Sequence, residues 1–273
     1  MDKFSTLYLH DNDYHLTSNA LNLNNGIQMS CHGHLRPPEL LELIAKQRYG
    51  VEYQPIISVK DSEIFAYECL SRFLDKNNNF LRPDLVFSTL HDNPLSLFQV
   101  EYEQKKLQLS CAPDNTDIFV NLDQDSYSAL GPLKVDNPFV TLFKDYSKAN
   151  IVVELIENSQ LSDAMMSLAM IDDLTKNNIN TAIDDLFNPQ SMLSTSVLQL
   201  VDYIKLDKYV IANNSNKNFM AMVNSVIHYA HDTGKKVILE GIETENDLCF
   251  AKKLGADYVQ GFLYKKLFKC INK

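Results

Sequence analysis

The chain has 273 residues, with 35 Asp and Glu against 25 Lys and Arg and a formal net charge of −10. Its 45% apolar and 22% charged residues are typical of a globular protein with one large or two small domains, and exclude a disordered chain. The acidic excess argues against a nucleic-acid polymer as partner, because such binders rely on clustered Lys and Arg.

The sequence also lacks the patterns of membrane and secreted proteins. No run of about 18 apolar residues occurs, so we expect no membrane insertion. Residues 1–16 contain an early acid and no apolar signal segment, which makes a cytoplasmic location the expectation. The five cysteines are an odd number without a C-x-x-C pair, which favours reduced thiols over a disulfide framework.

Two groups of Cys and His residues resemble metal ligands, but a structural interpretation is favoured for both. The first is the CHGH stretch of Cys31, His32 and His34, which has no fourth ligand at a usual spacing. The second is the pair of His228 and His231 on a predicted helix. We expect neither group to hold a metal.

The first 35 residues are rich in Asn, Asp and Ser and predict a leader or accessory segment, followed by one main domain over 36–273. In the main domain, strand and helix patterns alternate along the chain. Taken in order, the expected elements are a helix at 38–48, strands at 51–58 and 64–73, helices at 82–91 and 95–109, a strand at 117–123, a helix at 139–149, a strand at 151–158, a helix at 159–176, a strand at 181–187, a helix at 191–200, a strand at 203–207, a helix at 218–234, a strand at 235–242, a helix at 244–255 and a strand at 258–263.

Eight apolar strands that alternate with helices predict a closed (β/α)8 barrel of the TIM-like α/β class. The connection between the first two strands is the short polar turn KDSE, whereas a parallel pair needs a crossover of a dozen or more residues. We therefore expect the first strand to run antiparallel to the second.

Polar side chains stand at the carboxyl ends of seven of these strands, where barrel enzymes gather their active sites. They are Glu68, Asn121, Glu154, the pair Asp184 and Asp185, Lys205, Glu240 and Gln260. Five carboxylates that converge on one mouth repel one another unless a cation is bound. Their all-oxygen chemistry selects Mg²⁺ or Mn²⁺, and paired aspartates suit two ions about 3.5–4 Å apart, the arrangement used to cleave phosphodiesters.

Each of these residues also has a purely structural interpretation. Glu68 is compatible with an ion-paired rim position, Asn121 with a turn, Asp185 with a helix cap and Lys205 with charge balance. Only their joint placement at one end of the barrel favours function. Motifs for dinucleotide binding, a P-loop and a serine-hydrolase elbow do not occur in the sequence.

Eight segments in order resemble the EAL-domain phosphodiesterases, over about residues 38–268. They are YQPIIS (53–58), YECLSRF (67–73), FVNLD (119–123), VELIEN (153–158), AIDDL (182–186), YIKLDK (203–208), LEGIET (239–244) and DYVQGF (257–262). That family hydrolyses the bacterial second messenger cyclic di-GMP to linear pGpG. The family's Glu-Ala-Leu triplet stands here as Glu68-Cys69-Leu70.

The resemblance implies two divalent cations, Mg²⁺ or Mn²⁺, and a role for each matching residue. The implied ligands of one ion are Glu68, Asn121, Glu154 and Asp184, and those of the other are Asp184, Asp185 and Glu240. Lys205 resembles the residue that orients or deprotonates the attacking water, and it joins Glu240, Gln260 and Glu68 as the implied catalytic groups.

The resemblance also implies how the substrate and the loops are held. Gln54 and Arg72 match positions that contact the guanine and phosphate groups, and a planar guanidinium suits phosphate. Glu243 matches a residue that steadies the loop after the strand at 181–187. A homodimer is the oligomeric state that the resemblance suggests.

One segment departs from the family. The usual stretch DDFGTGYSSL stands here as DDLFNPQSML (184–193), without either glycine and with Pro189 in the loop, so we expect the loop to follow another path. The alternative hypothesis is a catalytically silent EAL-type module that binds cyclic di-GMP or a protein partner. A Schiff-base aldolase on Lys205 is disfavoured, because nearby carboxylates raise the lysine pKa.

Overall fold

Eight strands close into a barrel in the computed structural model, which describes residues 35–131, 136–156 and 161–272. The barrel strands are β1 (Tyr49–Ser58), β2 (Ile64–Leu74), β4 (Asp117–Asn121), β5 (Ile151–Ile156), β6 (Asn180–Leu186), β7 (Tyr203–Leu206), β8 (Lys236–Leu239) and β9 (Tyr258–Val259). The strands from β2 through β9 pair in parallel, and β1 closes the ring because it pairs with both β2 and β9. The predicted (β/α)8 class is confirmed.

The first strand runs antiparallel to the second, as the short turn predicts. Ile57 of β1 faces Ile64 of β2, and the turn between them is closed by hydrogen bonds from Ser58 N–H to Glu63 O and from Ser62 N–H to Ser58 O, both 2.9 Å. A turn this short returns the chain alongside itself, so β1 is antiparallel to β9 as well.

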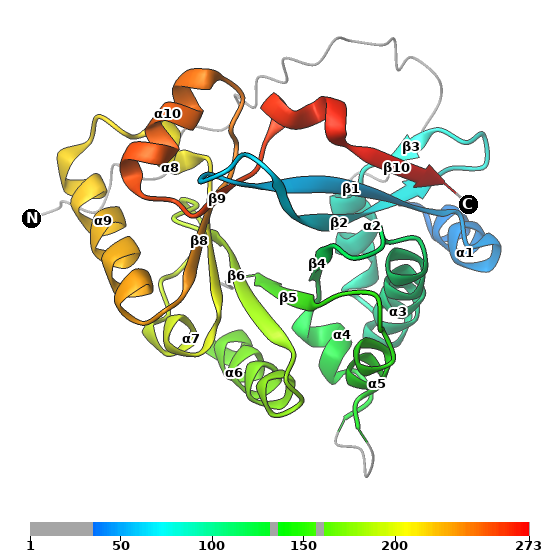
Figure 1. Ribbon diagram of the computed structural model, residues 1–273. Coiled ribbons are helices and arrows are strands. Elements are labelled where there is room, and N and C mark those ends of the chain that lie inside the picture. Colours follow the sequence, from blue (N-terminus) through cyan, green and yellow to red (C-terminus); the bar gives the residue numbers. More distant parts are fainter. Residues whose placement is uncertain (1–34, 132–135, 157–160, 273) are drawn as a thin grey trace, which may run out of the picture.

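Helices surround the barrel (Figure 1). They are α1 (Pro37–Lys46), α2 (Pro83–Leu90), α3 (Pro94–Ser110), α4 (Gln124–Ser128), α5 (Pro138–Lys144), α6 (Leu161–Lys176), α7 (Thr195–Leu200), α8 (Tyr209–Ala212), α9 (Lys217–Asp232) and α10 (Glu245–Leu254). Several begin at polar caps, as Ser194 accepts a hydrogen bond from Val197 N–H and Thr244 from Asp247 N–H. Within the described residues, no helix has the length and apolar character needed to cross a membrane.

Two short strands extend the sheet beyond the barrel. The long β1 and β2 continue past the ring, where β10 (Lys269–Asn272) pairs with β1 and β3 (Phe80–Leu81) pairs with β2. In Figure 1 the red β10 lies beside the blue β1. The result is a four-stranded antiparallel ribbon above one side of the barrel mouth.

Several element boundaries differ from the predicted ones. The strand expected at 258–263 ends at Val259, because the chain turns at Gly261 into a 3₁₀ helix over Phe262–Leu267. The helix expected at 191–200 begins only at Thr195, after its cap, and α5 stops at Lys144. The short elements β3, α4, α8 and β10 carry too few residues for a periodic signal. The leader expected at 1–35 lies almost wholly outside the described residues.

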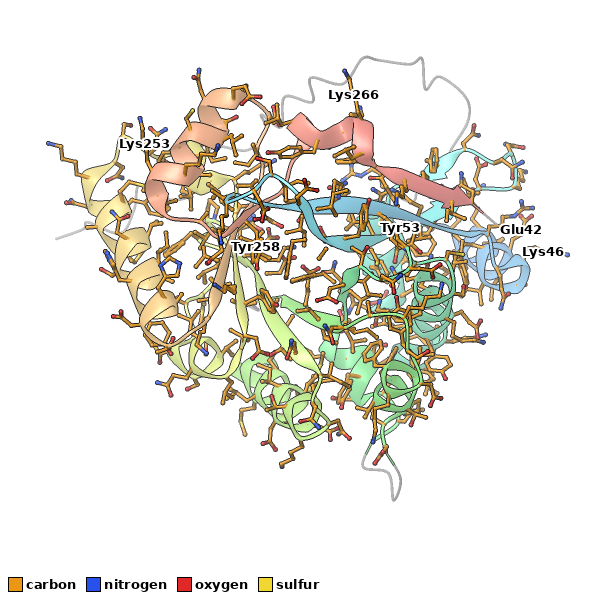
Figure 2. All side chains as sticks on the ribbon, viewed as in Figure 1. Glu42, Lys46, Tyr53, Lys253, Tyr258 and Lys266 are labelled. Carbon is orange, nitrogen blue, oxygen red and sulfur yellow. The ribbon has the colours of Figure 1, made fainter. Side chains whose placement is uncertain are left out.

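The barrel interior begins with an apolar layer. Ile56, Ala66, Phe119, Val152, Ala182 and Ile238 form one buried cluster, against which Phe65, Tyr203 and Tyr258 pack. The rings of Phe119 and Tyr203 meet edge to face at 5.1 Å between centroids. A larger core fills the space between strands and helices. Figure 2 shows Tyr53 and Tyr258 lying against the strands, while Glu42, Lys46, Lys253 and Lys266 point outward at the periphery.

Truncation of the layer's central ring tests its contribution to stability. We expect Phe119→Ala to lower the free energy of unfolding by about 3–5 kcal/mol, because a fully buried ring is lost and a cavity remains. Urea denaturation of the purified protein measures it. Phe80→Ala, at a 58% exposed ring, is the matched control and changes stability by less than about 0.5 kcal/mol. A loss below about 1 kcal/mol for Phe119→Ala contradicts the packing role.

Candidate metal centre

The apolar layer is covered by a second layer of polar side chains, one from each barrel strand. Successive residues of a strand point to opposite faces, so the residue two places from an inward apolar residue also points inward. The polar residues that follow this alternation are Gln54, Glu68, Asn121, Glu154, Asp184, Lys205, Glu240 and Gln260. They include all the sequence-predicted residues of the strand ends except Asp185. The parallel strands place seven of them at their carboxyl ends, as predicted, and Gln54 comes from the antiparallel β1.

Lys205 lies at the centre of this layer and is fully buried. Its Nζ is 2.7 Å from Glu154 Oε1, 2.8 Å from Asp184 Oδ1 and 2.8 Å from Glu240 Oε1. A fourth carboxylate, Glu68, lies 3.7 Å away. One ammonium is thus shared by four carboxylates from four strands.

Glu68 is fixed by two amides that lie on either side of it. Asn121 Nδ2 donates to Glu68 Oε1 at 3.1 Å, and Gln260 Nε2 donates to Glu68 Oε2 at 2.5 Å. Because the Asn121 nitrogen is engaged in this way, its side-chain oxygen is the atom left to act as a ligand. Gln260 Nε2 also lies 3.4 Å from Gln54 Oε1, which links the layer across β9 and β1.

A bulge in β6 brings both aspartates to the mouth. The pairing of β6 with β7 runs from Ile183 opposite Ile204 to Leu186 opposite Leu206, so β6 contains one residue more than its partner. Asp185 occupies the left-handed region at φ 54°, which Asp tolerates better than most residues. In a regular strand the two carboxylates would face opposite sides of the sheet.

Glu240 stands one residue past β8, at a close approach of two backbones. The next residue, Gly241, has φ 72°, and a Cβ there would lie 2.2 Å from Lys208 Cβ. Only glycine fits this position, and it brings the segment after β7 against the segment after β8. The glycine of the LEGIET motif therefore supports the placement of Glu240.

The electrostatics of the layer are unbalanced. Burial raises the pKa of Glu240 to about 8 and that of Asp185 to about 7, with the Asp184 charge adding to both. Burial also raises the pKa of Glu154 well above its usual value. For Glu68, burial is outweighed by the Lys205 ammonium and by the two amides, so its pKa is lowered.

Lys205 itself is held in the charged form. Burial disfavours the ammonium, but the carboxylates of Asp184, Glu154 and Glu240 outweigh it and raise the lysine pKa well above its ordinary value. A protonated lysine can donate hydrogen bonds and supply charge, but it cannot accept a proton from water. Its surroundings also oppose the lowered pKa that a Schiff-base lysine needs.

These observations fit a site for divalent cations. Ligand oxygens of Glu68, Glu154 and Asp184 lie within 4.8 Å of one another, and so do those of Asp184, Asp185 and Glu240. Glu154 Oε2 is buried without a hydrogen-bond partner among the described residues. Hard oxygen donors and uncompensated carboxylates are the chemistry that Mg²⁺ and Mn²⁺ take. The two groups have Asp184 in common.

The polar layer opens into a cavity of about 340 Å³. Besides two glycines, its lining includes three residues that the sequence analysis did not select, Asp207, Lys208 and Phe262. Asp207 is buried, and its charge helps to raise the pKa of Asp185. Asp207 and Lys208 stand within the YIKLDK segment, so their position directly after the strand was the signal that could have identified them.

Glu243 also lines the cavity, and its backbone N–H donates to Asp247 at 3.2 Å. Its predicted role toward the loop stays a prediction.

The two residues predicted to contact substrate lie at different distances from the metal-ligand layer. Gln54 lines the cavity, whereas Arg72 lies four residues beyond Glu68 on the projecting ribbon, about 13 Å along the strand. They share one partner, since Glu52 Oε1 accepts hydrogen bonds from Arg72 at 2.7 Å and from Gln54 at 2.9 Å. Glu52 thus links the wall of the mouth to the ribbon above it.

The loop after β6 is held by contacts of its own residues. Asn188 N–H donates to Asp185 O, and Asn188 Oδ1 accepts from Gln190 N–H, both at 3.0 Å. Phe187 takes φ 73° and is nearly buried, with its ring edge to face on Phe219 at 5.6 Å. A side-chain turn and an aromatic contact thus anchor this loop, and its difference in path from the loop of the EAL-domain phosphodiesterases stays a prediction.

Two histidines lie beside carboxylates away from the polar layer. One ring nitrogen of His91 is 3.2 Å from Asp123 and the other is 3.6 Å from Asp125. His231 lies 3.1 Å from Asp257. The CHGH stretch lies outside the described residues.

Comparison with known proteins gives a consistent result. The EAL domain model matches residues 38–266. The chain is 23% identical to cyclic di-GMP phosphodiesterase PdeL of Escherichia coli over 94% of this chain and 68% of that protein. It spans only 27% to 44% of the length of several other curated relatives.

Solved structures share the fold. A cyclic di-GMP complex of the MucR phosphodiesterase of Pseudomonas aeruginosa matches with a TM-score of 0.65 and 21% identity, over 82% of this chain and 95% of that one. A manganese and cyclic di-GMP complex of Klebsiella pneumoniae BlrP1 matches with a TM-score of 0.65 and 18% identity, over 83% of this chain and 56% of that one.

Removal of the central ammonium tests the charge balance of the layer. We expect Lys205→Met to lose about 3–5 kcal/mol of unfolding free energy in EDTA, because four carboxylates lose their common partner. Added Mn²⁺ then raises the melting temperature of this variant more than that of the wild type, as measured by differential scanning fluorimetry. Lys176→Met, at an exposed ion pair, is the control. Equal Mn²⁺ shifts in Lys205→Met and the wild type contradict a cation site beside Lys205.

Proposed function

The chain belongs to the EAL domain family, and on that premise we propose that it is a metal-dependent phosphodiesterase that hydrolyses cyclic di-GMP to linear pGpG. The observation that carries the proposal is the polar layer, in which two groups of oxygen ligands share Asp184 beside a buried lysine. Relatives named as cyclic di-GMP phosphodiesterases, and solved relatives that hold this dinucleotide, support the substrate.

The proposal includes two ligand sets, which the family resemblance implies and the two groups of neighbouring carboxylate oxygens support. Glu68, Asn121, Glu154 and Asp184 would hold one divalent cation, and Asp184, Asp185 and Glu240 the other. When bound, such ions polarise a phosphate and make a coordinated water more acidic. Manganese and calcium complexes of the Klebsiella relative support the use of a divalent ion. Mg²⁺ or Mn²⁺ as the ions, and their number, stay predictions.

The chain's own side chains bind and orient the substrate. Lys205 supplies a fixed positive charge below the reacting phosphate, and as an ammonium it orients water rather than deprotonating it. Gln54 offers an amide at the wall of the mouth, and Arg72 a guanidinium at its outer edge for phosphate or guanine. The apolar layer beneath, with Phe119 and Tyr203, closes the barrel below the reacting groups.

The altered loop is compatible with the ligand set. Asp184 and Asp185 lie before the first changed residue, and the bulge that presents them is formed within β6. Asn188 and Phe187 anchor the loop that follows. The silent module is therefore the second candidate rather than the first. A homodimer, a cytoplasmic location and the role of Glu243 stay predictions.

Substitution of the shared ligand tests the proposal. We expect Asp184→Asn to reduce kcat by at least about 10²–10³-fold, because both cation groups lose a charged ligand. Conversion of cyclic di-GMP to pGpG is followed by anion-exchange chromatography with Mg²⁺ or Mn²⁺. Wild-type turnover should vanish in EDTA and return with either ion.

The exposed Asp92→Asn is the matched control and keeps wild-type turnover. Full activity of Asp184→Asn, or wild-type turnover that persists in EDTA, contradicts the mechanism. Cyclic di-GMP binding by the wild type without any pGpG points instead to the silent module.

A further inference from the structure

Helix α3 buries a row of polar side chains. Glu101, Gln104, Lys105 and Gln108 are each at most 3% exposed, and we call them the polar stripe of α3. Their spacing of three and four residues places them on one helix face, where apolar residues normally pack. Burial of polar groups costs free energy unless they are hydrogen-bonded, so each of these side chains is expected to have a partner.

Two glutamines of the stripe hold the backbone of β2. The described pairing of β2 with β4 ends at Cys69. There Gln108 Nε2 donates to Cys69 O at 2.9 Å, and three residues further Gln104 Nε2 donates to Arg72 O at 3.2 Å. Tyr53, labelled in Figure 2, secures the helix from β1 through a hydrogen bond from its hydroxyl to Gln108 O at 2.8 Å. The side chains of α3 thus hold β2 where its pairing with β4 has ended.

The acidic member of the stripe holds the end of β4. Glu101 Oε1 accepts a hydrogen bond from Asp123 N–H at 3.0 Å, two residues after Asn121. Lys105 Nζ lies 3.4 Å from the same oxygen and is fully buried with it. The ion pair therefore fixes the acceptor that holds the segment after β4.

We propose that the polar stripe of α3 positions the active site, a role that rests on the proposed function. Gln104 and Gln108 fix the stretch of β2 between Glu68 and Arg72, and Glu101 fixes the segment that follows Asn121. None of the stripe residues lines the described cavity, so they are positioning residues and not catalytic ones.

Hydrogen bonds suit this task better than apolar packing does. Replacement of a buried ion pair by apolar side chains is often neutral or stabilising, so stability alone does not explain Glu101 and Lys105. A directed hydrogen bond instead fixes the height of a strand end, and displacement of a reacting group by about 1 Å can cost about a hundredfold in rate. Partners of metal ligands affect metal affinity in the same way.

The Glu101 contact is tested by two double variants, of which only one keeps a hydrogen-bond acceptor at position 101. Glu101→Gln with Lys105→Met keeps an acceptor for Asp123 N–H, whereas Glu101→Leu with Lys105→Met removes it, and both lack the ion pair. Mn²⁺ binding to the full chain is measured by calorimetry and needs no turnover. We expect the first pair to bind within about twofold of the wild type and the second about tenfold more weakly.

The Gln104 contact is tested by Gln104→Met, which removes the donor to Arg72 O. We expect KM for cyclic di-GMP to rise about tenfold while kcat and Mn²⁺ affinity stay within about twofold, because Arg72 lies far from the ligands. Lys106→Met, on the exposed side of the same helix, changes none of these values. If Gln104 had only a structural role, Gln104→Met would lower stability without raising KM selectively over kcat.

The outcomes separate the two proposals. Equal Mn²⁺ constants in the two double variants, together with an unchanged KM in Gln104→Met, overturn the positioning role and leave the proposed function intact. If the double variants do not fold, the KM result of Gln104→Met decides alone. Absence of Mn²⁺ binding by the wild type contradicts the proposed function, and the positioning role with it.

Discussion

The structure depends on one buried ammonium placed among carboxylates from four strands. Lys205 contacts Glu154, Asp184 and Glu240 within 2.8 Å and has Glu68 close by. Such a cluster costs desolvation energy that hydrophobic residues would not cost, so stability alone does not explain it. Burial, with the charges of neighbouring carboxylates added to it, raises the pKa values of Glu154 and Glu240 although Lys205 lowers them, so one positive charge does not offset the cost of the buried acids. The site is thereby prepared for further cations.

The barrel interior holds the acidic side chains in a polar layer that is stacked on an apolar layer. The apolar layer supplies the closed interior, and the polar layer uses the same alternation two residues further along each strand. Glu68, Glu154 and Asp184 are therefore fixed by strands that are paired on both sides, and Glu240 follows such a strand directly. The helix side contributes as well, since α3 holds the ends of β2 and β4 through Gln108 and Glu101.

Part of the chain's acidic excess is concentrated at the mouth of the barrel. Seven of its 35 acids lie at the mouth, namely Glu68, Glu154, Asp184, Asp185, Asp207, Glu240 and Glu243. An anionic dinucleotide approaching them meets repulsion unless cations are present. The same charge that argues against nucleic-acid polymers at the level of composition would, under the proposed function, make a small anionic substrate dependent on divalent ions.

Alternating patterns and short turns were enough to predict the barrel, its antiparallel first strand and the polar residues at the strand ends, because these are local properties of the chain. The sequence could not reveal the bulge that turns Asp185 toward Asp184, since bulges depend on pairing with β7. Nor could it reveal that Glu52 joins Arg72 to Gln54, or that Glu101 meets Asp123, because residues distant along the chain meet only after folding. Residue types determined the chemistry of the site. The tertiary structure decided which atoms share a partner, because burial and distance set the charge balance that the sequence leaves open.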